Sequence, residues 1–180
     1  MAVWILRYGH RRFRDQRAST HVALAGRALG ADGMILCGEQ DDELLARLKK
    51  TSAQWGGNFQ VEYSDNWEKT ARQFKERGGC FVHLTMYGLP LQKQMAAVRK
   101  KGKDCLVLVG SQKVPIEAYE LADFNIGVTN QPHSEIAALA IFLDKYFKGK
   151  ELEKEFDGPN KITPRKIGKN VVLWKKNVGV

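Results

Sequence analysis

The sequence predicts an α/β fold with a six-stranded parallel sheet and helices on both of its faces. Short apolar runs of strand type alternate along the chain with longer stretches in which apolar residues recur at helical spacing. The run at residues 105–109 is apolar throughout, which is typical of a parallel strand buried on both faces. A chain of 180 residues can bury one core of ordinary size. We therefore expect one α/β domain at residues 1–150 and an extension at residues 151–180.

The elements are expected in strict alternation along the domain. Apolar and β-branched clusters predict strands at residues 3–7, 33–36, 59–63, 80–84, 105–109 and 125–128. The intervening stretches predict helices at residues 20–29, 41–54, 67–76, 90–100, 116–123 and 135–147. Apolar residues share one face of the third helix (Trp67, Ala71 and Phe74) and of the last (Ile136, Leu139 and Leu143). Such alternation indicates a parallel sheet, because each parallel pair needs a crossover between its strands.

The pattern changes after the last predicted helix. Residues 151–156 are charged and weakly apolar, and Asp157-Gly158-Pro159-Asn160 breaks the chain. Residues 161–180 hold two β-type runs around Gly168-Lys169-Asn170. We expect a basic β-hairpin appended to the domain.

The positive charge is concentrated at the two ends of the chain. Of the net charge of +9, residues 1–30 contribute six arginines against one acid, and residues 161–180 contribute six basic residues and no acid. Segregated basic ends around a neutral body indicate a polyanionic partner. Five arginines between Arg7 and Arg17, interleaved with Tyr8 and Phe13, suit RNA, whose phosphates they grip and whose splayed bases they stack on. We expect an RNA partner and no DNA.

Cysteine usage and hydropathy indicate where the protein works. Cys37, Cys80 and Cys105 stand in or beside apolar runs, without C-x-x-C spacing, and read as buried thiols in a reducing compartment. The apolar run at residues 2–6 is too short for a signal peptide, and no segment approaches the roughly 20 apolar residues of a membrane span. We expect a cytoplasmic protein with no membrane partner.

Three predicted strands end in loops suited to bind a small molecule. They are the segments at residues 81–88, 105–115 and 124–135, and in the last of these Ser134 or His133 stands where a helix needs an N-cap. Ligands of α/β sheets bind outside the carboxyl ends of the strands. The three ends are therefore expected to form one pocket.

Several common chemistries are disfavoured by missing motifs. No G-x-G-x-x-G follows the first strand and no G-x-x-x-x-G-K-[ST] occurs, which argues against a nicotinamide dehydrogenase and a P-loop NTPase. No Ser or Cys has the G-x-S-x-G setting of a hydrolase nucleophile. His10, His21, His83 and His133 lack metal-ligand spacing, so no metal site is expected, and His83 reads as a hydrogen-bonded pocket wall. An arginine is no ordinary base, but it can orient a ribose hydroxyl and stabilise a developing alkoxide.

Four motifs, in order, carry a family resemblance. They are Arg14-Asp15-x-Arg17-x-x-Thr20-His21-Val22-Ala23-Leu24, Val82-His83-Leu84-Thr85-Met86-Tyr87-Gly88, Leu108-Val109-Gly110-Ser111-Gln112-Lys113-Val114-Pro115 and Asn130-Gln131-Pro132-His133-Ser134-Glu135. Together they resemble the archaeal tRNA (cytidine(56)-2'-O)-methyltransferases of the SPOUT superfamily, over residues 3 to about 148. The tail also looks like the C-terminal extension of that family.

The resemblance implies a deep trefoil knot near the C-terminal half of the domain, an exception to the rule against knots, and a homodimer. We expect the partner-facing surface of this dimer to include the first and last helices. The apolar load of the last helix agrees with this, since Ile141 and Phe142 lie off its main stripe. The resemblance also implies S-adenosyl-L-methionine as cofactor. The residues that would hold it are Leu84, Gly110, Ser111, Gln112, Lys113, Val114, Val128, Thr129, Asn130, Gln131, Pro132, His133, Ser134 and Glu135.

The implied reaction is transfer of a methyl group to the ribose 2'-hydroxyl of a T-loop cytidine, position 56, of tRNA. The superfamily has an Asn at the start of the first helix and a catalytic Arg six residues later. With a helix from Thr20, that spacing gives His21 and Arg27, so Arg17 in the R-D-x-R stretch is an equal candidate. Two alternatives remain at this level: a related methyltransferase acting on another nucleotide or base, and a knotted RNA-binding protein without activity.

Overall fold

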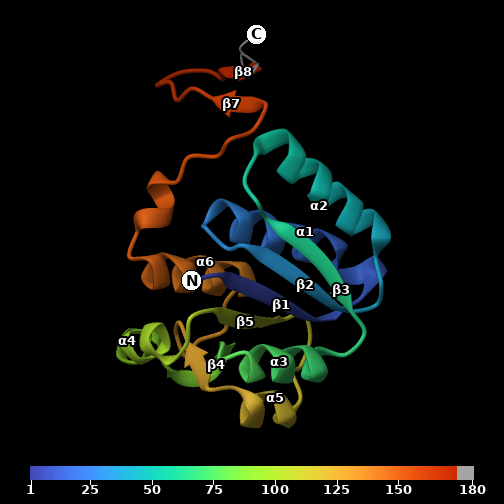
Figure 1. Ribbon diagram of the computed structural model, residues 1–180, viewed down its shortest axis with the longest axis vertical. Helices are drawn as coiled ribbons and strands as arrows, with labels where there is room; N and C mark the ends of the chain where they lie inside the picture. The colour runs from blue at the N-terminus through green and yellow to red at the C-terminus, as the bar shows by residue number, and fades with distance from the viewer. Residues whose placement is uncertain (174–180) are drawn as a thin grey trace.

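Six parallel strands form the central sheet of the computed structural model, which describes residues 1–173 (Figure 1). Along the sheet the strand order is β3-β2-β1-β5-β4-β6, and every neighbouring pair is parallel. The predicted α/β fold class is therefore confirmed. The strands are β1 (Val3–His10), β2 (Gly33–Gly38), β3 (Gln60–Ser64), β4 (Cys80–Pro90), β5 (Cys105–Gly110) and β6 (Phe124–Gly127).

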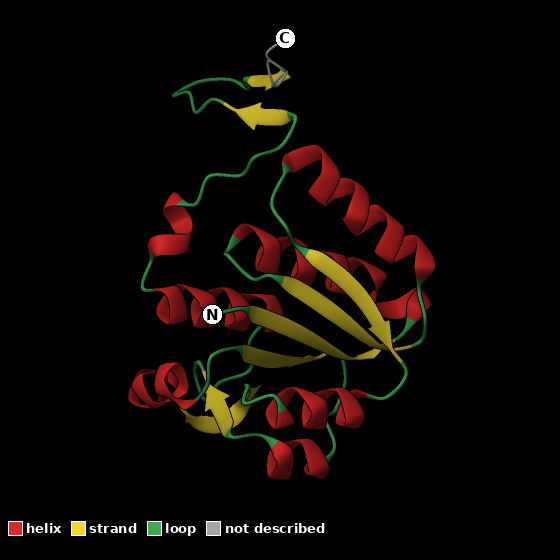
Figure 2. Ribbon diagram, in the orientation of Figure 1, coloured by secondary structure: helices red, strands yellow, loops and turns green. Residues whose placement is uncertain are grey.

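Helices cover both faces of this sheet (Figure 2). One face packs against α1 (Arg12–Ala28), α2 (Asp42–Trp55), α4 (Leu91–Lys101) and α6 (Glu135–Phe147), and the other packs against α3 (Trp67–Glu76) and α5 (Ile116–Leu121). Side chains alternate along each strand, so that Val3 and Ile5 of β1 join the first core while Leu6 joins the second. No helix within residues 1–173 is long and apolar enough to cross a membrane.

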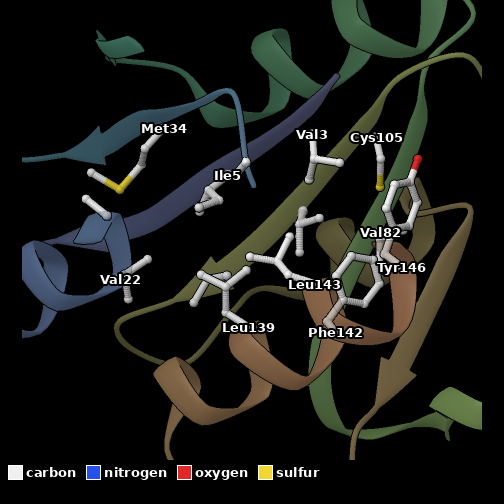
Figure 3. Close-up of a cluster of buried hydrophobic side chains, with 14 of the residues drawn as sticks. Val3, Ile5, Val22, Met34, Val82, Cys105, Leu139, Phe142, Leu143 and Tyr146 are labelled. Carbon is white, nitrogen blue, oxygen red and sulfur yellow. The ribbon is translucent and has the colours of Figure 1, made fainter. Parts of the chain in front are cut away.

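The larger core lies between the sheet and α6 (Figure 3). Three side chains of α6 are fully buried there against strand residues such as Val3 and Val82: Leu139, Phe142 and Leu143. Burial of each such side chain contributes about 1.5–3 kcal/mol to the stability of the fold. The expectation that Phe142 faces away from the domain is wrong, because its ring reaches into this core and stacks on Tyr146. Ile141 remains 44% exposed, as expected.

Helix α1 begins at Arg12, eight residues before the predicted start at Thr20. The buried positions of α1 include Asp15, Ser19 and Gly26. Because the face of α1 that packs against the sheet is partly polar, its apolar residues do not recur at helical spacing over the first turns of the helix. Asp15 accepts from the backbone N–H of Arg11 (3.0 Å), the N-cap residue. A carboxylate at this end also complements the helix dipole. The arginine-rich segment is accordingly helical from Arg12 on, whereas Arg7 lies at the end of β1.

Strand β4 continues to Pro90, beyond its predicted end at Leu84. Its pairing with β6 is interrupted between Leu84 and Leu89, so the intervening residues bulge away from the ladder. Gly88 allows this return, because a Cβ there would strike the backbone of Asn125 and Ile126. The bulge adds a wall at the carboxyl edge of the sheet.

The C-terminal segment forms a short 3-10 helix, η1 (Lys150–Glu153), and an antiparallel pair, β7 (Asn160–Ile162) and β8 (Val171–Leu173). These two strands lie within the segment expected to form a hairpin, and the rest of that segment, residues 174–180, lies outside the described part of the chain. The segment crosses the end of α2 where Gly158 meets Gly56, whose φ is 76°. Any side chain at Gly56 would strike this backbone.

All three cysteines are buried and unpaired, as predicted. Burial raises the pKa of the Cys37 thiol to about 12. A hydrogen bond with Cys80, together with burial, raises the pKa of Cys105 well above its ordinary value. The thiols of Cys37 and Cys105 therefore stay protonated and unreactive near neutral pH.

Candidate active site

The three predicted loops meet around one cavity of about 650 Å³ at the carboxyl edge of the sheet. The bulge of β4, the loop after β5 and the loop after β6 each supply part of the wall. The expected convergence of these strand ends is confirmed. Among the predicted cofactor-binding residues, those that line the cavity are Leu84, Gly110, Ser111, Gln112, Lys113, Val114, Val128, His133 and Glu135.

The other predicted cofactor residues shape the loop between β6 and α6 without lining the cavity; they are Thr129, Asn130, Gln131, Pro132 and Ser134. Asn130 Nδ2 donates to the carbonyl oxygens of Met86 (2.6 Å) and Gly88 (3.1 Å), which ties this loop to the end of β4. Ser134 is the N-cap of α6, its Oγ accepting from the N–H of Ile136 at 3.2 Å. His133 does not cap the helix, but bonds to the Gln131 carbonyl (2.6 Å).

Helix α5 supplies one wall of the cavity that the sequence did not predict. Ile116 and Tyr119 lie on the side of α5 that faces the cavity. Thr85 of β4 lines the cavity beside them, and its Oγ1 is 3.1 Å from the Tyr119 hydroxyl. A helix of six residues shows too little periodicity to reveal which side is inward. The remaining wall residues that were not among the predicted cofactor-binding residues are His83, Met86, Tyr87, Val109, Ile126 and Ala138.

His83 is a buried, hydrogen-bonded wall of the cavity, as predicted. Asn125 Nδ2 donates to the carbonyl of Tyr119 (2.8 Å), which leaves Asn125 Oδ1 to accept from His83 Nδ1 at 3.0 Å. Burial lowers the pKa of His83, and the ring of Tyr119 packs edge-on against it with centroids 4.5 Å apart. The imidazole is therefore neutral with its proton on Nδ1, so Nε2 is an acceptor.

Arg7 links the loop after β5 to the loop before α6. Its fully buried guanidinium donates to the carbonyl of Gly110 (2.9 Å), to Glu135 Oε1 (3.2 Å) and to Ser19 Oγ on α1 (3.1 Å). Burial lowers the pKa of Arg7, and the charge of Glu135 opposes this. The expectation that Arg7 grips RNA is wrong for this residue, because its donors are used inside the fold.

The buried polar chain continues from Arg7 to the start of α2. Because Arg7 is always a donor, Ser19 Oγ accepts from it and has its own proton for His10 Nδ1, 2.9 Å away. His10 Nε2 then faces Asp41 Oδ2 at 3.5 Å, and Asp41 caps α2. Burial lowers the pKa of His10, which is consistent with a neutral ring in this chain.

The N-terminal turn of α1 adjoins the cavity. Arg11 pairs with Asp15 (2.7 Å) and its Nη2 donates to the carbonyl of Ser111 at 3.3 Å, in the loop after β5. The hydrogen bond to Asp15 raises the pKa of Arg11. Arg12, Phe13, Arg14 and Arg17 remain exposed on this turn and the next, so they form the outward part of the predicted RNA-binding cluster.

The two candidate catalytic arginines lie at opposite ends of α1. Arg17 is exposed in the second turn, six residues after the N-cap residue Arg11. Arg27 is in the last turn, where it donates to the carbonyl of Gly56 and stacks on Phe156, with its guanidinium carbon 4.8 Å from the ring centroid. Because α1 runs back along the sheet from the end of β1, Arg27 lies at the opposite edge from the cavity.

Comparisons with known proteins agree with this geometry. A family model described as tRNA ribose 2'-O-methyltransferase, aTrm56, matches residues 55–172. The chain is 52% identical to a tRNA (cytidine(56)-2'-O)-methyltransferase of Methanocaldococcus jannaschii, covering 98% of this chain and 99% of the relative. It is 48% identical to the enzyme of the same name from Pyrococcus horikoshii, covering 93% and 83%.

Solved structures show the same fold at low sequence identity. The SpoU methyltransferase AviRb from Streptomyces viridochromogenes, in complex with the cofactor AdoMet, aligns with a TM-score of 0.62 at 12% identity, over 83% of this chain and 58% of that one. The TrmH/SpoU tRNA modifying enzyme of A. aeolicus aligns with a TM-score of 0.58 at 16% identity, over 84% and 76%. The chain thus spans little more than half of AviRb and three quarters of the second structure. By its near-full-length relatives and the matching family model, the chain belongs to the aTrm56 family of tRNA ribose 2'-O-methyltransferases.

Proposed function

We propose that this protein transfers a methyl group from S-adenosyl-L-methionine to the ribose 2'-hydroxyl of cytidine 56 in the T-loop of tRNA. Family membership gives the reaction and the substrate. The observation that carries the proposal within the fold is the cavity formed by three strand ends, beside a helix that exposes a cluster of arginines.

The residues of the cavity fit the cofactor. Its volume of about 650 Å³ lies within the range of small-molecule sites. Apolar walls at Leu84, Val114 and Val128 suit an adenosine. Gly110 also lines the cavity, and its loop has no room for a side chain there, because a Cβ would lie only 2.7 Å from Val114 Cγ2. When bound, the cofactor supplies a methyl group activated by a positively charged sulfonium.

The role of the protein in the reaction is mainly to position the two reactants. A bound cofactor would supply the methyl group to the 2'-oxygen while its sulfur keeps the electron pair of the broken bond, and the hydroxyl proton would pass to water. Arg17 is the better candidate to orient the hydroxyl and stabilise its developing charge. With the helix starting at Arg12, the superfamily spacing counted from the N-cap falls on Arg17, and Arg11 links this turn to Ser111 in the cavity wall.

The implied homodimer, knot and cytoplasmic location are part of the same proposal. Helices α1 and α6 pack against each other, and each leaves an apolar side chain exposed, Phe13 by 97% and Ile141 by 44%. A partner subunit that covers both side chains would remove this apolar surface from water. Light scattering should then report about twice the chain mass of 20.3 kDa.

The reaction itself is tested with an unmodified tRNA transcript and methyl-labelled cofactor. Nuclease digestion should release one 2'-O-methylcytidine per tRNA. Because 2'-O-methylation removes the nucleophile that alkali uses to cleave RNA, one T-loop bond should also become resistant to alkaline hydrolysis. Recovery of a base-methylated nucleoside, or of no labelled product at saturating cofactor, would refute the proposal.

A further inference from the structure

A second cavity, of about 670 Å³, lies where the C-terminal extension crosses the ends of α1 and α2. We call it the extension cleft. Because both helices end at the amino edge of the sheet, the cleft is on the opposite side of the domain from the active site. Its walls are Leu24, Arg27, Ala28, Thr51, Trp55, Lys154, Glu155, Phe156, Asn160, Lys161, Ile162 and Pro164.

The charge in the extension cleft is mostly positive. Arg27, Lys154 and Lys161 line it, and among residues 1–173 the one acidic residue in its wall is Glu155, which is 3.8 Å from Lys161. Four other arginines have carboxylate partners in the part of the chain that the structure describes: Arg7, Arg11, Arg47 and Arg72. Arg27 has none within residues 1–173, and burial alone lowers its pKa.

The surroundings of Arg27 offer fewer hydrogen-bond acceptors than its guanidinium has N–H donors. A guanidinium carries five N–H groups. Within the described chain, the protein acceptor of Arg27 is the Gly56 carbonyl, and its buried Nε has no partner. A partly buried cation without a counter-charge favours an anion from outside.

Aromatic side chains provide the rest of the recognition surface. Trp55 and Phe156 both line the extension cleft. The Arg27 guanidinium lies 4.8 Å and the Lys154 ammonium 5.7 Å from the centroid of the Phe156 ring. Cations beside aromatic faces are the combination that proteins use to hold an unstacked base and its phosphate.

We propose that the extension cleft binds one unstacked nucleotide of the substrate RNA, with its phosphate on Arg27 and Lys154 and its base against Trp55. This inference rests on the proposed function, since it takes tRNA as the substrate. At about 670 Å³ the cleft has about the same volume as the active-site cavity, of about 650 Å³, whose residues fit a nucleoside cofactor. The cleft also continues into the hairpin, where Arg165, Lys166 and Lys169 are exposed. The phosphate backbone of the bound RNA can therefore extend from the cleft along this basic surface.

The test is the affinity of unmodified tRNA transcript for Lys154→Ala and for Trp55→Leu, measured by fluorescence anisotropy across a salt series. Lys154→Ala should weaken binding about tenfold and reduce the slope of log affinity against log salt by about one, because one phosphate contact is lost. Trp55→Leu should also weaken binding, by roughly 5- to 100-fold, with the slope unchanged, because stacking carries no charge. Both variants should raise the KM for tRNA, with kcat and cofactor affinity kept.

The matched control is Arg72→Ala on α3. Arg72 is an exposed cation paired with Glu68 at 2.6 Å, on the other face of the sheet, and its loss should leave tRNA affinity within twofold of wild type. If Trp55→Leu lowers the melting temperature strongly, Phe156→Leu replaces it. Ultraviolet cross-linking should in addition join the RNA to a peptide containing Trp55 or Phe156.

The outcomes separate this inference from the proposed function. Unchanged tRNA affinity in Lys154→Ala and in the aromatic variant would overturn the inference, even if the wild type makes 2'-O-methylcytidine. Polyglutamate that displaces the RNA at equal charge would also overturn it, by showing a general polyanion surface. A wild type that binds tRNA through the cleft but makes no 2'-O-methylcytidine would instead refute the proposed function.

Discussion

Replacement of Arg7 by Met tests whether the buried guanidinium holds the active site together. Arg7 donates three hydrogen bonds, to Gly110, Glu135 and Ser19, from a fully buried position. Each bond involves a charged donor and is worth about 1.5 kcal/mol or more. Their loss alone would cost about 4.5 kcal/mol of unfolding free energy.

Two features of the structure reduce this cost. The Glu135 side chain is 37% exposed and Gly110 lines the cavity, so both acceptors can regain water. In addition, the Arg7 charge loses its water on folding at a cost in free energy, and Met avoids this cost. The replacement therefore recovers part of the stability lost with the hydrogen bonds. We therefore expect Arg7→Met to lower the unfolding free energy by about 2–3 kcal/mol.

Urea unfolding measures this difference directly. With a slope of about 2–3 kcal/mol per molar for a domain of this size, the midpoint should fall by about 1 M while the slope stays constant. Because the guanidinium holds the loops after β5 and before α6, calorimetry should show cofactor affinity about tenfold weaker. The control Arg72→Met removes an exposed ion pair and should change stability by less than about 1 kcal/mol. If Arg7→Met matches wild type in both midpoint and cofactor affinity, the assignment of Arg7 as the link between the loops is wrong.

Three further expectations follow from the same geometry. Gly110→Trp should abolish cofactor binding in calorimetry while the circular-dichroism spectrum is kept, because the side chain would fill the cavity; full binding would place the cofactor elsewhere. Arg17→Ala should reduce turnover at least about 100-fold with cofactor affinity unchanged, the loss typical of one stabilising donor; a loss below tenfold would remove it from the reaction. Burial lowers the pKa of His10 and of His83, so the unfolded chain takes up protons first and stability should fall as the pH drops below about 6.5. Urea midpoints at pH 7.5 and 5.5 check this, and equal midpoints would contradict it.

The sheet and the cavity were predictable because their signals are local. Each buried parallel strand reads as a short apolar run, and in a parallel sheet the ends of such runs lie at one edge. The sequence alone therefore predicts that the loops at Gly110 and at Glu135 line one pocket, as the structure shows. The wall from α5 could not, because Ile116 and Tyr119 occur in a helix too short to show a face.

The early start of α1 was not predictable from hydrophobic periodicity. Its inner face carries Asp15 and Ser19, and these residues are buried only because Arg7, His10 and Arg11 bond to them. Each of these polar residues, taken alone, is typical of a surface. Only the tertiary pairing makes their burial favourable, and a single sequence does not reveal that pairing.

Helix α1 thereby explains why the basic N-terminal segment is not one uniform RNA surface. Its 17 residues span about 25 Å, so the helix reaches from the active-site edge of the sheet to the opposite edge. Arg11 and Arg17 stand at the first edge, and Arg27 stands at the second, in the extension cleft. Arg7 and His10 lie beneath the helix and join its inner face to the cofactor loops. RNA contacts at both ends of one rigid helix would fix the orientation of the tRNA relative to the methyl donor, which is the positioning that this reaction mainly requires.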